Sequence, residues 1–178
     1  MKPFLLIAAA TLCFAATESR VSRVTILSVQ SSINQSFAPR GVDPYQVLGD
    51  ARGTYLEGYG TLFTIELDLI GRGLAMTPFK PTMTPEELES LRERKLKKLV
   101  VMKETMRTLM MNASGTLEGL PPNERVAMEA ILITFSWENS RGIPQRVFMS
   151  AEKQKLLDAK AAHAGQPELA AIIEEQER

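Results

Sequence analysis

Residues that most often carry chemistry are scarce in this chain, which has one cysteine and one histidine among its 178 residues. Zinc sites are built largely from cysteine and histidine side chains. A Ser-His-Asp or Cys-His nucleophile needs a histidine held by neighbouring groups, and His163 stands alone in an alanine-rich stretch late in the sequence. We therefore expect neither a metal site of this kind nor a catalytic triad, and no cofactor.

Disulfide bonds are excluded as well, because the single cysteine, Cys13, lies inside an apolar N-terminal run. Small secreted domains of eukaryotes are often cross-linked. An exported domain without disulfides is more typical of a bacterium, and its stability must come from packing.

An excess of charge of either sign is also missing, since 21 basic and 21 acidic side chains give a formal net charge of zero. Proteins that bind nucleic acid or anionic lipid use an excess of lysine and arginine to attract phosphate groups. The composition therefore predicts no nucleic-acid partner.

The N-terminus has the three parts of a secretory signal peptide. Lys2 is positive, residues 4–14 form an apolar run, and Ala15 and Ala16 supply the small residues that signal peptidase prefers. The run is too short to span a bilayer of about 30 Å as a helix. We interpret residues 1–16 as a signal peptide, so the mature chain is expected in the periplasm or outside the cell, without stable membrane insertion.

Two adjacent segments, 54–59 and 61–70, carry the clearest β-strand signal. In the second segment the side chains of one face alternate with more polar ones, as in a half-buried strand. That face consists of Thr61, Phe63, Ile65, Leu67 and Leu69. Gly58 and Gly60 lie between the segments and supply the backbone freedom of a tight turn. We predict a β-hairpin with one buried face.

Two other segments have apolar residues three and four positions apart, which is typical of amphipathic helices. The first covers residues 21–37. The second covers 84–117 and begins with a strong start signal, in which Thr84 caps the helix, Pro85 takes the first helical position and Glu87 completes a capping box. Lys95 interrupts the apolar stripe of this second helix.

A second hairpin is predicted near the C-terminus. Residues 126–137 are rich in β-branched and aromatic side chains, residues 145–149 form a return strand, and glycine and proline between them favour a turn. Ser150 is expected to cap a helix that runs to about Ala162.

The predicted order is therefore helix, hairpin, helix, hairpin, helix. Two hairpins with apolar faces need a covering layer, which helices supply. We predict an α+β fold, a two-layer sandwich whose four-stranded antiparallel sheet carries helices on one face, as a single domain over residues 17–163. Residues 164–178 are expected to form an acidic, frayed tail, and the alternative is a short helix that docks on this domain or on a partner.

Three acidic side chains are the candidates for catalysis. Glu66 and Asp68 are two residues apart on a predicted strand, which places them on the same face, and Glu57 on the neighbouring strand would approach them. A pair of carboxylates can hydrolyse a glycosidic bond by acid-base chemistry. We favour the alternative, in which all three belong to the solvated face of the sheet.

Methionines supply a candidate metal site. Met102, Met106 and Met110 recur at four-residue spacing and so share one face of a helix. Thioether ligands select Cu(I), which would indicate a copper-handling protein. Methionines at this spacing more often fill an irregular core, and we favour that interpretation.

The string Gly58-Tyr59-Gly60 is the candidate for partner binding. Two glycines around a tyrosine allow a partner's backbone to approach closely. A tight hairpin explains the same residues and is favoured.

The function expected from the sequence is that of an exported bacterial protein without enzymatic activity that binds or assembles with a protein. The alternatives are a hydrolase that uses the hairpin acids and a methionine-rich copper-handling protein. If the chain is a hydrolase, the three acids should line a pocket. If it handles copper, the methionine sulfur atoms should converge at the surface. A binding domain predicts an exposed apolar patch or a free sheet edge.

Overall fold

The computed structural model describes residues 21–71 and 83–178. Within these residues the chain forms the following helices and strands in order: α1 (Arg23–Ser36), β1 (Gln46–Val47), β2 (Arg52–Leu56), β3 (Gly60–Asp68), α2 (Pro85–Thr116), β4 (Arg125–Leu132), β5 (Arg146–Glu152), α3 (Lys153–Ala161), α4 (Gln166–Ile172) and β6 (Glu174–Glu177). The predicted signal peptide lies outside the described residues. None of the described helices is both long enough and apolar enough to cross a membrane.

All the strands belong to one mixed sheet. β1 and β2 both pair with β3, and β4, β5 and β6 follow in order on its other side. The predicted α+β sandwich and both hairpins, β2–β3 and β4–β5, are confirmed. The sheet differs in detail from the four-stranded antiparallel expectation, because it has six strands and because β3 and β4 run parallel.

The parallel pair follows from the long helix between the two hairpins. α2 has 32 residues, or about 48 Å at 1.5 Å per residue. A helix that crosses the sheet returns the chain to the end where the preceding strand began, so that the next strand runs parallel to it. The sequence pattern of each hairpin carries no information about this pairing.

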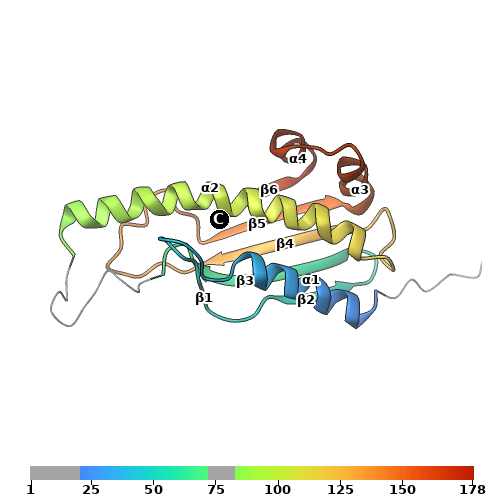
Figure 1. Cartoon of the computed structure of the whole chain (residues 1–178), viewed down its shortest axis with the longest axis horizontal. Helices are drawn as coiled ribbons and strands as arrows, with labels where there is room; N and C mark the ends of the chain where they lie inside the picture. The colour runs from blue at the N-terminus through green and yellow to red at the C-terminus, as the bar shows by residue number, and fades with distance from the viewer. Residues whose placement is uncertain (1–20, 72–82) are drawn as a thin grey trace, which may run out of the picture.

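The helices lie on one face of the sheet. Figure 1 shows α1 and α2 in front of the sheet, running roughly along the strands, with α3 and α4 beside the C-terminal half of α2. The core fills the space between the two layers. It includes Ile33, Phe63, Ile65, Leu67, Met102, Met106, Val126, Met128, Val147 and Met149. The predicted buried face of the first hairpin is therefore confirmed.

Local signals set the two main helices. Ser22 caps α1 by accepting a hydrogen bond from the backbone N–H of Thr25. The predicted capping box of α2 is present, with Thr84 and Glu87 each accepting from the other's backbone N–H. Such caps satisfy N–H groups that the helix itself leaves unpaired.

The N-terminal part of α2 extends beyond the sheet (Figure 1). Nine residues of β3 span only about 30 Å. The connection between β4 and β5, residues 133–145, packs against this overhang, where Arg92 donates to the carbonyl oxygen of Arg141 at 3.2 Å. In the same loop the rings of Phe135 and Trp137 stack with centroids 5.9 Å apart.

Two predictions for the C-terminal part are wrong. Ser150 does not cap a helix, because β5 continues through it to Glu152 and α3 begins only at Lys153. The tail is not frayed: it forms β6 and, as in the alternative interpretation, a short helix, α4, that docks on this domain. Leu169 and Ile173 are buried, 1% and 5% exposed, so enough apolar surface is available in this segment to order it.

Candidate functional site

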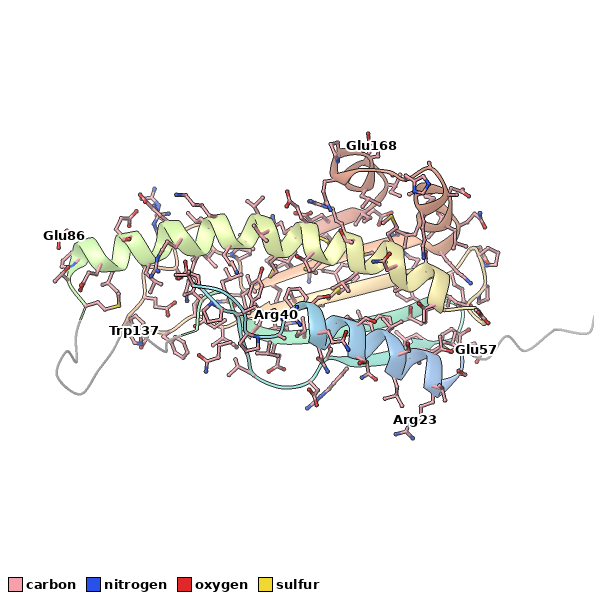
Figure 2. All side chains as sticks on the ribbon, in the orientation of Figure 1. Arg23, Arg40, Glu57, Glu86, Trp137 and Glu168 are labelled. Carbon is pink, nitrogen blue, oxygen red and sulfur yellow. The ribbon has the colours of Figure 1, made fainter. Side chains whose placement is uncertain are left out.

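Glu57 lies far from the other two candidate acids. It occupies the turn between β2 and β3, whereas Glu66 and Asp68 lie towards the other end of β3. The six steps along the strand from Gly60 to Glu66 span about 20 Å. Figure 2 shows Glu57 towards one end of the molecule and Trp137, which belongs to the β4–β5 loop, towards the other.

Glu66 and Asp68 also lie in different surroundings. Glu66 is exposed, whereas Asp68 is 1% exposed. The expectation that both share a face fails because β3 ends at Asp68, where the carboxylate turns toward α2. Asp68 Oδ1 lies 2.7 Å from Lys95 Nζ and accepts a hydrogen bond from the backbone N–H of Ile70.

Lys95 is the centre of a buried ion cluster. Its Nζ also donates to Glu138 Oε2, in the β4–β5 loop, at 2.6 Å. The side chains of Lys95, Asp68 and Glu138 are between 2% and 4% exposed. Burying a charge is costly unless it is paired, and here one ammonium group pairs with two carboxylates from different elements. Among the described residues Asp68 Oδ2 has no hydrogen-bond partner.

The cluster ties α2 to the end of β3 and to the β4–β5 loop. Because its three side chains are shielded from solvent, the arrangement suits a structural connection rather than a reaction with a substrate. From the sequence alone, Lys95 is only an interruption of the apolar stripe of its helix. Its position between Leu91 and Leu99 at four-residue spacing is the signal that could have revealed a buried ion pair.

The methionine stripe lies in the core. Met102 and Met106 are 0% exposed and Met110 is 1% exposed. All three belong to the hydrophobic cluster between helices and sheet. This placement gives them a packing role and does not present their sulfur atoms at the surface.

The Gly58-Tyr59-Gly60 string forms the turn of the first hairpin. Gly58 and Gly60 both have positive φ angles. A Cβ atom at Gly60 would lie 1.9 Å from the carbonyl oxygen of Arg125, and the backbone N–H of Arg125 donates to the carbonyl oxygen of Tyr59 at 2.8 Å. Close approach of β4 therefore accounts for Gly60, while Tyr59 is 38% exposed.

Within the described part of the chain, no helix covers the face of the sheet opposite α1 and α2, which we call the open face. Figure 1 shows the described helices gathered on the other side. Three rows of paired residues cross the centre of this open face. From β3 through β4 to β5 they are Leu62, Ala127 and Ser150, then Thr64, Glu129 and Phe148, then Glu66, Ile131 and Arg146. Leu62, Ile131 and Phe148 are half-buried, so apolar surface remains accessible at the centre.

Charged residues of both signs lie between and around these apolar side chains, with Glu129 in the middle of the central row. By register, four arginines and four glutamates lie on the open face: Arg52, Arg125, Arg146, Arg178, Glu66, Glu129, Glu152 and Glu174. The strands contain no lysine. Two ion pairs form within the face, Arg125 with Glu174 at 2.7 Å and Arg146 with Glu129 at 3.5 Å. The hydrogen bond and charge of Arg125 lower the pKa of Glu174.

A shallow hollow indents one side of the open face. Its volume is about 240 Å³, and it is lined by Glu129, Arg146, Phe148, Gln176 and Arg178. A second hollow of about 330 Å³ lies between α1 and α2, where Arg40 stands near the end of α1 (Figure 2). The candidate acids and methionines line neither of these two hollows.

Within residues 21–71 and 83–178, no three histidine, cysteine, aspartate or glutamate side chains gather into a group that could hold a metal ion. No family model, curated protein or solved structure matches the chain. The open face is therefore the candidate functional site of the described structure.

Proposed function

We propose that this protein is an exported bacterial assembly domain without enzymatic activity, and that it works by binding a protein through the open face of its sheet. The observation that carries the proposal is the composition of that face. An antiparallel sheet that merely faces water carries polar side chains there. This face instead has the half-buried apolar side chains Leu62, Ile131 and Phe148 in its three central rows, around Glu129.

The charged residues around this centre support the same proposal. Protein interfaces are enriched in arginine and aromatic residues and depleted of lysine. The basic residues of the open face are all arginines, whereas α2 on the opposite layer carries lysines at positions 95, 97, 98 and 103. The placement of Glu57, Glu66 and Asp68 in three separate surroundings gives no comparable support to a hydrolase.

A cysteine label tests whether the open face is covered in the native setting. Loss of Cys13 with the predicted signal would leave the introduced thiol as the sole cysteine. Thr64→Cys places a thiol at the centre of the open face. Thr105→Cys is the matched control, because Thr105 is also half-buried but lies on α2 in the other layer.

In the native host, we expect a maleimide to react with Thr64→Cys more slowly than it does in dilute purified protein. Thr105→Cys should react at the same rate in both settings. Equal rates for Thr64→Cys in the two settings would show that nothing covers the face, and would overturn the proposal.

A further inference from the structure

We propose that the occupant of the open face is a second copy of this chain, which forms a two-fold dimer with sheet packed against sheet. The inference rests on the proposed binding role of that face. It adds the identity of the partner and the arrangement of the two copies.

The row that contains Ile131 is self-complementary. Glu66 lies beside Ile131 on β3, and Arg146 lies beside it on β5. A two-fold axis that runs along β4 in the plane of the interface exchanges the two sides of this row. Glu66 of one copy then faces Arg146 of the other, and the two Ile131 side chains meet at the axis. A two-fold interface requires this kind of self-complementary pattern.

The neighbouring row fits the same axis. Phe148 of one copy faces Thr64 of the other, since these residues flank Glu129 on β5 and β3. The half-buried Phe148 ring thereby gains a partly apolar neighbour.

The axis brings like charges together at two positions of β4. The two Glu129 side chains approach each other, and Arg146, 3.5 Å away in the same chain, offsets their charge. The two Arg125 side chains do the same, and Glu174, 2.7 Å away in the same chain, offsets theirs.

The balance of charge favours this partner over a strongly charged one. Four arginines and four glutamates leave the open face without net charge, and the whole chain also has a formal net charge of zero. Two copies therefore approach without long-range repulsion. A markedly acidic or basic protein would find no excess of the opposite sign.

The size of the face is close to what a stable dimer needs. The six strands contain 35 residues in all, and at about 4.8 Å by 3.4 Å for each residue they give a flat area of roughly 570 Å². A specific complex buries about 800 Å² on each partner. The relief of the side chains adds to the flat area, so the face supplies most of the required surface.

Charge reversal across the axis tests the arrangement. Sedimentation equilibrium of the processed full-length protein measures the dimer dissociation constant. Glu66→Arg and Arg146→Glu each place like charges opposite one another, and each should raise that constant by about tenfold or more. The double variant restores opposite charges and should dimerise as the wild type does. Glu93→Arg, at an exposed position on α2, is the matched control and should leave the constant unchanged.

Three results would overturn the inference: a wild-type protein that stays monomeric at every soluble concentration, single variants that dimerise as well as the wild type, or a double variant that stays as weak as the single ones. Circular dichroism of each variant checks that it is folded, and both substituted side chains are exposed. If the purified protein is monomeric but Thr64→Cys is still protected in the native host, the second copy is excluded while the binding role of the face stands.

Discussion

Among single residues, the strictest requirement falls on Lys95, whose ammonium group is buried between two carboxylates. A buried ion pair adds little stability compared with well-packed apolar side chains, but removal of one partner leaves an uncompensated charge. Here the loss of Lys95 would leave two carboxylates buried without their cation. Substitution of Lys95 should therefore be more destabilising than substitution of a lysine on the exposed side of the same helix.

Replacement of Lys95 by methionine keeps the length of the side chain and removes its charge. We expect Lys95→Met to lower the free energy of unfolding by roughly 3 to 5 kcal/mol. Lys97→Met changes an exposed residue of the same helix and should alter that free energy by less than about 0.5 kcal/mol. Urea denaturation measures both variants. Equal losses would show that the buried cluster has no special role in stability.

Among the elements, the last helix and strand differ most from expectation, because they extend the sheet and complete the helical layer. Deletion of residues 166–178 should lower the free energy of unfolding by several kcal/mol. Burial of Leu169 and Ile173 alone contributes about 1.5 to 3 kcal/mol each. Thermal or urea denaturation of the truncated protein measures the change. An unchanged midpoint would mean that this segment is not docked in solution.

Attachment of β6 to α2 should depend on pH. Burial raises the pKa of Glu175, but hydrogen bonds from Lys103 and Arg107 outweigh this effect and leave the pKa below its usual value of 4.5. A carboxyl group whose pKa is lower in the folded state stabilises the fold above the pKa of the unfolded state, and this contribution is lost as the pH falls. We therefore expect the free energy of unfolding to decrease on acidification below about pH 4.5.

Glu175→Gln should remove part of that decrease, because glutamine does not titrate. Glu57→Gln, at an exposed turn position, serves as the control and should keep the wild-type pH dependence. Denaturation curves at several pH values compare the three proteins. A Glu175→Gln variant with the full wild-type slope would place the acid sensitivity elsewhere.

Elements with strong local signals could be predicted from the sequence. Alternation from Thr61 to Leu69 and the capping box at Thr84 depend on neighbouring residues alone, and both predictions are confirmed. The parallel pairing of β3 with β4 could not be predicted, because it depends on how α2 crosses the sheet. β6 could not be predicted because its four residues, Glu-Glu-Gln-Glu, have little strand propensity. In addition, the residues that it contacts on α2, Lys103 and Arg107, lie about 70 residues earlier in the sequence.

The candidate site was less predictable than the fold. Polar residues on the outer face of a sheet are compatible both with exposure to water and with an interface, and the sequence does not distinguish the two. Only the order of strands places Glu66, Ile131 and Arg146 in one row. Asp68 was assigned to the wrong surroundings because period-two alternation holds within a strand and not at its end.

For the whole molecule, the proposed role depends on export. We expect the mature protein to begin between about Ala15 and Glu18, because small residues there end the apolar run. The intact mass or N-terminal sequence of material released from the host measures the cleavage position. Retention of residues 1–14 in the soluble product would contradict the export proposal.

The stacked rings of Phe135 and Trp137 give the molecule a built-in optical probe. Trp137 is the single tryptophan in the sequence, and it precedes Glu138, the loop residue held by Lys95. Its fluorescence therefore reports on the β4–β5 loop, whereas circular dichroism reports on the helices. If the loop detaches before the sheet melts, emission changes first and ellipticity follows. Local opening around the buried cluster can thus be separated from global unfolding without any added dye.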